Sequence, residues 1–213
     1  RSTRVRSSAA SDVYKRQDRR IGSNFLKAGI GYGGSCFPKD TKALNFQSDH
    51  AGVKLKTVKA TIDVNREQRT RLIDKARRFF PTFRDVRVAI IGLTFKPGTD
   101  DLREAPAKQN IDILLNEGAD IIAWDPLGVE NFRKRYPNCA INFAKDIDEA
   151  LTDADVCLIM TEWEKIVEYP LDNYKKYMKR PLVFDGRNCY KLSEAEKHEI
   201  FYDSIGRKIV DTL

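Results

Sequence analysis

Hydrophobic residues in the second part of the chain cluster in short runs, and helix-like segments separate these runs. The runs predict buried strands at residues 86–91, 120–124, 155–160 and 182–184. The segments between them predict helices at residues 106–118, 146–152 and 171–178. Strands that alternate with helices of this length are typical of parallel βαβ units. We therefore expect an α/β domain, with a Rossmann-like, doubly wound parallel sheet, over residues 83–213.

The carboxyl ends of these predicted strands carry polar and basic residues. Ligands bind at this edge of doubly wound sheets, which draws attention to residues 92–96, Asp125, residues 161–162 and residues 185–187. Gly92 is followed by Leu-Thr-Phe rather than by the G-x-G-x-x-G fingerprint. The domain therefore need not hold a dinucleotide pyrophosphate in the usual way.

A helical central segment is predicted for residues 18–82. Pro38 and Asp40 are typical of a helix start, and Gly52 suits the position after its end. The spacing of apolar residues then predicts one long helix over residues 54–80, which the next proline ends. A helix of about 25 residues fits either a surface position or a link between two domains that also pairs with another subunit.

Residues 1–17 differ from the rest of the chain, because they are rich in Ser and Arg and show neither helical nor strand periodicity. We expect this segment to be a non-native or disordered leader. It holds five basic residues against one acidic residue, which leaves +3 of the net charge of +7 for the rest of the chain. This is an ordinary surface balance without a basic stripe, so we predict no nucleic-acid partner.

No apolar run approaches the ~20 residues that are needed to cross a bilayer, so we predict no membrane association. The four cysteines are Cys36, Cys139, Cys157 and Cys189. Because no C-x-x-C pair or nearby histidine gives a metal-ligand spacing, we expect no metal. Free thiols in a reducing cytoplasm are the interpretation that suits a chain of this size.

The strongest chemical signal is the glycine-rich run GIGYGGSCFPKD at residues 29–40. Glycines let backbone amides approach a ligand, and Cys36 follows them directly before a predicted helix. Partial positive charge at a helix start favours a thiolate, so Cys36 is a candidate nucleophile, with an inert core thiol as the alternative. Gly29, Gly31 and Gly34 also satisfy G-x-G-x-x-G, but no convincing strand precedes them.

Three segments together resemble a known family. They are the run at residues 20–40, GLTFKP with TDDLRE at residues 92–104, and DGRN at residues 185–188. In this order they resemble the UDP-glucose/GDP-mannose dehydrogenase family, over residues 18–205. The resemblance makes residues 83–213 the UDP-binding domain of that family.

The resemblance implies an enzyme that oxidises UDP-glucose to UDP-glucuronate with NAD in a four-electron reaction. Cys36 would attack the intermediate aldehyde to form a thiohemiacetal. A second oxidation would give a thioester, which water hydrolyses. Asp40 would handle a proton or activate water, and a helix-capping carboxylate is the alternative role for it.

The resemblance also assigns binding residues. For the UDP-sugar it implies Phe25, Lys27, Gly33, Phe95, Lys96 and Arg187. Arg20 would reach the substrate of a neighbouring subunit, which together with the long helix suggests a homodimer or a higher homo-oligomer. Arg103 would contact NAD. Arginine and lysine suit pyrophosphate and hydroxyl groups, and a solvated surface charge is the alternative for each basic residue.

Other substrates and another class of function stay open at this point. GDP-mannose and UDP-N-acetylmannosamine are the alternative substrates, although the runs GYGG and FPKD favour UDP-glucose. A non-catalytic nucleotide-sugar-binding module would have the same fold, but it needs no activated thiol such as Cys36. The N-terminal NAD-binding domain of the family is not among the segments found. We therefore expect the chain to be a C-terminal part that is inactive by itself.

Overall fold

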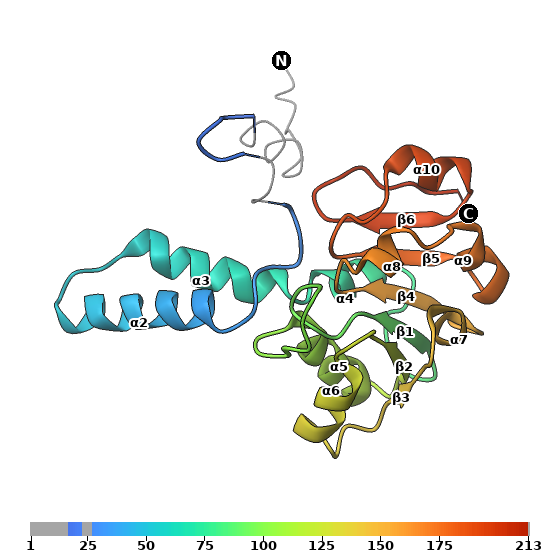
Figure 1. Ribbon diagram of the computed structural model, residues 1–213, viewed down its shortest axis with the longest axis horizontal. Coiled ribbons are helices and arrows are strands. Elements are labelled where there is room, and N and C mark those ends of the chain that lie inside the picture. The colour runs from blue at the N-terminus through green and yellow to red at the C-terminus, as the bar shows by residue number, and fades with distance from the viewer. Residues whose placement is uncertain (1–16, 23–26, 213) are drawn as a thin grey trace.

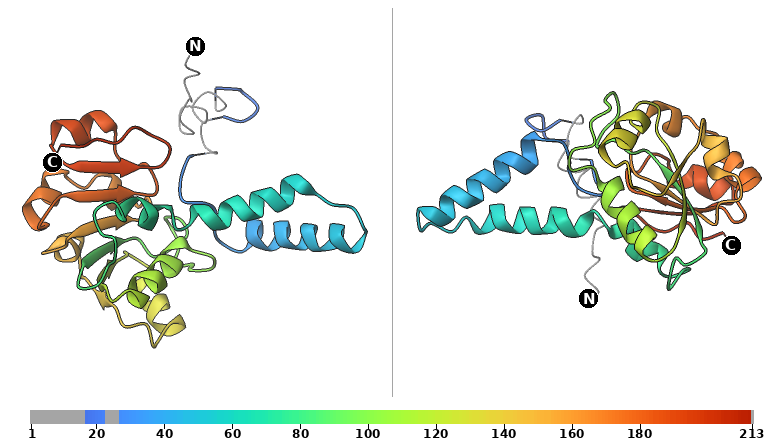
Figure 2. Two further views of the ribbon diagram at one scale, coloured as in Figure 1. Left: turned by 180° about the vertical axis from the view of Figure 1, so that it is seen from behind. Right: turned by 90° about the horizontal axis from the view of Figure 1, so that it is seen from below.

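The structure, a computed structural model, describes residues 17–22 and 27–212. It has two parts, a helical arm and an α/β domain (Figure 1). The arm consists of the helices α2 (Cys36–His50) and α3 (Lys56–Gln68), which lie side by side and project from the domain (Figure 2). The separation into a helical segment and a later α/β domain follows the order that the sequence predicts.

The α/β domain is built on one parallel sheet. Its strands are β1 (Arg87–Ile91), β2 (Asp120–Trp124), β3 (Asn142–Phe143), β4 (Val156–Ile159), β5 (Leu182–Asp185) and β6 (Phe201–Ser204). Their order across the sheet is β3-β2-β1-β4-β5-β6, and every neighbouring pair is parallel. The order reverses between β1 and β4, which is the switch point of a doubly wound sheet. The predicted Rossmann-like fold is therefore confirmed.

Helices cover both faces of the sheet because the strand residues alternate between two apolar cores. On β1, Val88 and Ile90 belong to one core, while Ala89 and Ile91 belong to the other. The first core is covered by α4 (Arg71–Ala76), α5 (Pro106–Asn116) and α6 (Val129–Arg135). The second core is covered by α7 (Ile147–Leu151), α8 (Glu164–Val167), α9 (Asp172–Tyr177) and α10 (Leu192–Lys197).

The prediction of one helix over residues 54–80 is wrong, because the helix breaks after Gln68 and a new one begins at Arg71. The side chain of Asn110 donates a hydrogen bond of 2.8 Å to the carbonyl of Arg69. In a continuous helix this carbonyl would instead accept a bond from an amide of the next turn. The break lets α4 turn onto the sheet and bury Leu72, while α3 stays in the arm.

The other predicted elements agree with the structure to within about two residues, the usual uncertainty of element ends. The first predicted helix starts slightly earlier than expected, at Cys36. Five short elements were not predicted, and they are α6, α8, α10, β3 and β6. None of the helices in the described part of the chain is long and apolar enough to cross a membrane.

Candidate functional site

The loop that precedes α2, defined here as the Cys36 loop (residues 29–35), lies across the carboxyl edge of the sheet. The amide of Ile30 donates to the carbonyl of Gly186 at 3.0 Å, just after β5. The amide of Gly34 donates to the carbonyl of Arg103 at 2.8 Å, in the segment after β1. These two bonds fix both ends of the loop to the edge at which doubly wound sheets bind ligands.

At two positions of the loop only glycine fits, because neighbouring atoms lie too close for a side chain. Gly31 has a φ of +87°, and a Cβ atom there would lie 2.5 Å from Oδ1 of Asn65. At Gly33, a Cβ atom would lie 2.5 Å from the carbonyl oxygen of Glu104 and 2.9 Å from Cβ of Phe95. The glycine-rich run therefore serves close docking of the loop onto its neighbours, which any side chain would prevent.

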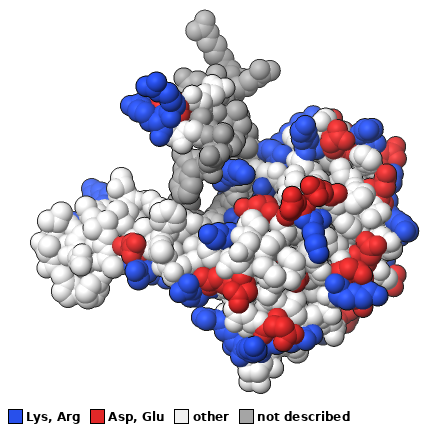
Figure 3. All heavy atoms as spheres, in the orientation of Figure 1, with Lys and Arg blue, Asp and Glu red and all other residues white. Residues whose placement is uncertain are grey.

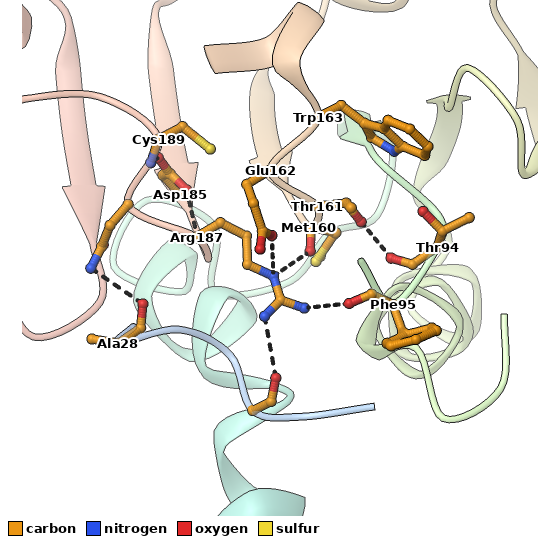
Figure 4. Close-up of polar contacts among 12 residues, drawn as sticks. Ala28, Thr94, Phe95, Met160, Thr161, Glu162, Trp163, Asp185, Arg187 and Cys189 are labelled. Carbon is orange, nitrogen blue, oxygen red and sulfur yellow. Dashed lines mark hydrogen bonds and ion pairs between the residues drawn. The ribbon is translucent and has the colours of Figure 1, made fainter. Parts of the chain in front are cut away.

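Arg187 joins the loop to the sheet (Figure 4). Its Nη1 donates to the carbonyl of Gly31 at 3.2 Å, and its Nη2 donates to the carbonyl of Phe95 at 3.3 Å. Its Nε donates to the carbonyl of Met160 at 2.9 Å and lies 3.3 Å from a carboxylate oxygen of Glu162. One guanidinium, 12% exposed, thus holds together the Cys36 loop and the ends of β1 and β4.

Asp185, the last residue of β5, shapes the turn that presents Arg187. This carboxylate is fully buried and accepts bonds from the amides of Arg187 at 2.7 Å and Cys189 at 2.6 Å. It also accepts a bond from the hydroxyl of Tyr202. Burial raises the pKa of Asp185, while these three donors act in the opposite direction. The turn therefore depends on a buried acceptor that is satisfied by its own neighbours.

A cleft of about 960 Å³ lies between the arm and the strand ends. Five residues that the sequence predicts for substrate binding line it, and they are Lys27, Gly33, Phe95, Lys96 and Arg187. The ammonium group of Lys96 lies 5.4 Å from the centre of the Phe95 ring. The structure therefore brings together residues that are up to 160 positions apart in the sequence.

Two of the residues predicted to bind the substrate are not described as part of this cleft. Arg20 is exposed and pairs with Asp18, two residues before it, at 2.7 Å. Its predicted contact with a neighbouring subunit is untested in a single chain and stays a prediction. Phe25 lies outside the described residues.

The helix α3 contributes lining residues that sequence reasoning missed. They are Thr61, Val64, Asn65 and Gln68. Glu162, to which its place at a strand end had drawn attention, also lines the cleft. Asn65 and Gln68 are three positions apart, which places two amide side chains on one face of a helix. This spacing is visible in the sequence, but it equally fits the polar face of a surface helix, so it does not by itself identify them.

Cys36 is the first residue of α2 and is exposed. Its Sγ lies 3.9 Å from the Ser35 hydroxyl, which does not cap the helix. The other three cysteines are more enclosed, and burial raises the pKa of Cys139, Cys157 and Cys189. Of the four thiols, Cys36 is the one that is exposed to solvent. The interpretation as a core thiol therefore does not hold for it.

Asp40 follows Cys36 by one helical turn, which places the two side chains on the same face of α2. It is exposed, and its carboxylate lies 3.4 Å from the ammonium group of Lys39. The interpretation as a helix cap is wrong, because Asp40 is the fifth residue of the helix rather than its N-cap. Its predicted role in proton handling stays a prediction.

A second, smaller hollow of about 300 Å³ lies beside the start of α2. Its basic side chains are Lys39, Lys42, Arg103 and Arg135. The pKa of Arg103 is raised chiefly by its hydrogen bonds to Asp101, with a further contribution from negative charge on Cys36. Arg103 therefore lines this hollow as a cation that is held in place by Asp101.

Asp125, at the end of β2, has a structural role. It is buried, and one carboxylate oxygen accepts bonds from the amide of Leu93 at 2.7 Å and from the indole of Trp163 at 3.1 Å. The other oxygen accepts the amide of Gly128 at 2.6 Å. Asp125 does not line the cleft, but it lines a separate hollow together with Trp124 and Lys165. The loop after β1 folds onto this carboxylate, which explains the departure from the dinucleotide fingerprint.

The fold and the site together define a nucleotide-binding type of α/β protein in which a cysteine loop is docked at the ligand edge. Residues 9–67 match the central domain of the UDP-glucose/GDP-mannose dehydrogenase family, and residues 89–192 match its UDP binding domain. The chain therefore belongs to the UDP-glucose/GDP-mannose dehydrogenase family.

Curated relatives agree with this assignment. UDP-glucose 6-dehydrogenase YwqF of Bacillus subtilis (strain 168) is 45% identical over 194 residues, which are 91% of this chain and 44% of the relative. UDP-glucose 6-dehydrogenase of Rhizobium meliloti (strain 1021) is 41% identical over 89% of this chain and 43% of the relative. The chain thus spans less than half the length of these relatives.

Solved structures show the same fold. A UDP-glucose dehydrogenase from the archaeon Pyrobaculum islandicum has a TM-score of 0.81 at 27% identity and is matched over 95% of this chain and 44% of that one. A UDP-D-ManNAc dehydrogenase from Pyrococcus horikoshii has a TM-score of 0.72 at 21% identity, with 93% of this chain and 44% of that one covered. At this lower identity the likeness supports the fold alone.

Proposed function

We propose that this chain supplies the catalytic cysteine and the UDP-binding half of an NAD-dependent UDP-glucose 6-dehydrogenase. The observation that carries the proposal is the docking of the Cys36 loop onto the ligand edge of the sheet through Arg187. A nucleophile placed at such an edge can act on a bound nucleotide sugar. The names of the curated relatives support the same reaction.

The cleft has the chemistry to bind a UDP-sugar. Lys27, Lys96 and Arg187 supply positive charge for a pyrophosphate, and the ring of Phe95 supplies an aromatic surface for a base. Three of the five N–H groups of Arg187 bind backbone carbonyls, which leaves two for a ligand. Arg187 therefore serves as a tether and as a substrate contact in this proposal.

Cys36 carries the substrate between two oxidations. NAD, when bound, accepts a hydride in each of them. At the aldehyde level the sulfur of Cys36 adds to the carbonyl carbon, and the carbonyl oxygen takes up a proton. Oxidation of the resulting thiohemiacetal leaves a thioester on Cys36, and water then cleaves the C–S bond to release UDP-glucuronate. In this proposal Asp40, which follows Cys36 by one turn of α2, exchanges the protons.

The second hollow fits the phosphate groups of NAD. Arg103, Lys39, Lys42 and Arg135 surround it, with Glu104 as the one acidic residue. It also adjoins the start of a helix of 15 residues, where backbone amides and the helix dipole favour an anion. These residues would hold the cofactor beside Cys36 while the UDP-sugar occupies the cleft.

The proposed sugar is glucose. The curated relatives that are 35–45% identical are named UDP-glucose 6-dehydrogenases. GDP-mannose and UDP-N-acetylmannosamine are the competing substrates, and only a direct comparison of the three separates them. A cytoplasmic location is consistent with four free thiols and stays a prediction.

A homodimer is the proposed assembly, formed through the arm. The helices α2 and α3 bury only Pro38, Ser48 and Asn65 within this chain. Leu44, Phe46 and Val53 are exposed on the arm, and Figure 3 shows few charged side chains on its visible face. Two helices with so little core need a partner to cover them, and a second copy offers the same apolar surface.

Light scattering tests the dimer. Phe46→Glu is expected to give monomers, whereas Leu127→Glu, on an equally exposed leucine of the α/β domain, is expected to leave the dimer intact. A monomeric wild-type chain, or dimers of the Phe46→Glu variant, would contradict this assembly.

Two experiments test the function. The first is a chimera in which the N-terminal part of the B. subtilis relative YwqF precedes this chain, assayed for NADH with each of the three nucleotide sugars. We expect turnover with UDP-glucose only, at two NADH per sugar, and none from this chain alone. The second is alkylation of this chain near neutral pH, in which Cys36 should react before Cys139 and UDP-glucose should slow its reaction. NADH production by the chain alone, or labelling of Cys36 that UDP-glucose leaves unchanged, would count against the proposal.

A further inference from the structure

The last turns of α3 hold the backbone of the Cys36 loop. Oδ1 of Asn65 accepts the amide of Tyr32 at 2.8 Å, and Nδ2 of the same side chain donates to the carbonyl of Tyr32 at 3.2 Å. The amide side chain of Gln68 donates to the carbonyl of Gly29 at 3.0 Å. Asn65 and Gln68, three positions apart on one helix face and defined here as the clamp, thus bind the start and the middle of the loop.

Asn65 is the central contact of this group. Its side chain pairs with both polar groups of one peptide residue, as a neighbouring β-strand would. It is 9% exposed and is the only residue of α3 that is buried in the described structure. Gly31 has no room for a Cβ atom because Oδ1 of Asn65 occupies that place. The loop and this amide therefore have complementary shapes as well as complementary hydrogen bonds.

We propose that Asn65 is a positioning residue, which fixes Tyr32 and thereby the sulfur of Cys36, four residues later at the start of α2. The inference rests on the proposed function, since it concerns the geometry of that reaction. Asn65 acts through the loop and does not touch the reacting atoms. Its two polar groups are already bonded to Tyr32, which distinguishes it from Lys96 as a substrate contact.

The first test measures the clamp in this chain without substrate. In Asn65→Ala we expect the protection of the Tyr32 amide from hydrogen exchange to fall about tenfold, as for the loss of one hydrogen bond. We also expect iodoacetamide to label Cys36 about threefold more slowly, with Cys139 as the internal reference, because a loosened loop also loosens the start of α2, where the helix dipole favours the reactive thiolate. Asn142→Asp, on an exposed asparagine of β3, is the control that leaves both values unchanged.

A second variant keeps the test valid if Asn65→Ala is unstable. In Asn65→Asp, one oxygen of the ionised carboxylate still accepts the amide of Tyr32. The other oxygen replaces the NH2 group, so it faces the carbonyl oxygen of Tyr32 without a proton to donate. Protonation supplies the missing donor, so protection of the Tyr32 amide should recover towards the wild-type value as the pH falls through the titration of this carboxyl. A purely steric role for Asn65 predicts no such recovery, because the two side chains have the same shape, and constant protection across this range would overturn the clamp.

The third test is kinetic and uses the chimera. We expect Asn65→Ala to lower kcat about 100-fold, with KM for UDP-glucose within about twofold of the wild-type value. A raised KM at unchanged kcat would make Asn65 a substrate contact and would overturn the proposal. So would unchanged exchange at Tyr32 together with unchanged labelling of Cys36. If the wild-type chimera makes no NADH, the proposed function fails, while the exchange and labelling results still decide the role of Asn65.

Discussion

The α/β domain and the arm are stabilised in different ways. In the domain, β4 and β5 are buried along their whole length, and both faces of the sheet are covered by helices. In the arm, two longer helices bury three residues between them. The arm is instead positioned by Asn65, Arg69 and Arg187, which bind the backbone of the Cys36 loop.

Because of this difference, the stability of the protein and the position of Cys36 depend on different kinds of contact. Hydrophobic burial is non-directional and tolerates small shifts, whereas hydrogen bonds to a glycine-rich backbone fix distances. The domain is therefore suited to supply folding free energy, and the contacts around the arm are suited to place a nucleophile. Substitutions in the two regions should affect different measurements.

The largest expected effect is on turnover and comes from the arm. Cys36→Ala should lower kcat of the chimera by about 10⁴-fold or more, because it removes the sulfur on which the proposed covalent intermediate forms. Cys36 is exposed, so the free energy of unfolding should change by less than about 0.5 kcal/mol. Urea unfolding and NADH formation are the two measurements. Residual activity above about 1% of the wild-type rate would remove Cys36 from the mechanism.

The next effect is on stability and comes from the domain. Phe184 on β5 is fully buried, with its ring centre 6.2 Å from that of Phe79 and 5.6 Å from that of Phe201. Phe184→Ala should lower the free energy of unfolding by about 3–5 kcal/mol. Leu44→Ala, on the exposed surface of the arm, should cost less than about 1 kcal/mol in a dilute, monomeric sample. Equal losses in the two variants would contradict the contrast between the regions.

A matched pair of glycines separates backbone strain from loop docking. Gly31 and Gly52 have similar positive φ values, +87° and +71°, but a Cβ atom on Gly52 would meet nothing within 4 Å. Alanine at either position should cost about 1–2 kcal/mol of stability for the left-handed backbone. Only Gly31→Ala should also slow the alkylation of Cys36, because it displaces Asn65. Slower alkylation in Gly52→Ala would show that strain in the arm, rather than docking, controls the thiol.

The smallest expected effect depends on pH. The pKa of Glu104 is lowered chiefly by its hydrogen bond to Lys42, and also by Arg69. A lowered folded-state pKa contributes stability that is fully present above the ordinary glutamate value of about 4.3 and is lost as the pH falls through the folded value. Glu104 is partly exposed, so the contribution should stay below about 1 kcal/mol.

Unfolding titrations of Glu104→Gln measure this contribution. The variant should be less stable than the wild-type chain at pH 7, and the difference should shrink as the pH falls below 4. Glu130→Gln, on an exposed pair with Arg133, is the control and should show a smaller difference at every pH. A gap between Glu104→Gln and wild type that stays constant down to the lowest pH would mean that the carboxylate charge of Glu104 contributes nothing.

The α/β domain was predictable because its strands are buried on both faces and appear as apolar runs. β3 escaped prediction because two residues give no usable period, and β6 escaped it because its sequence, FYDS, is not an apolar run like those of β4 and β5. The break between α3 and α4 escaped it for another reason. The apolar spacing continues through Arg69, and the competing bond comes from Asn110, 41 residues later.

The candidate site was predictable where a residue type carries the chemistry, and Cys36 and Lys96 belong to this group. The clamp was not, because Asn65 and Gln68 look like the ordinary polar face of a surface helix. Their function depends on the backbone of a loop that is more than 30 residues away. Hydrogen bonds to backbone groups leave no complementary residue type in the sequence, and tertiary structure is needed to find them.

The anchor provided by Arg187 also sets an order of events during synthesis of the chain. Gly31 leaves the ribosome 156 residues before the guanidinium that will hold it. Closing so long a loop is entropically costly, so the sheet must assemble through β5 before the anchor exists. Cys36 therefore reaches the position it has in the structure only after β5 and the turn to Arg187 have been translated.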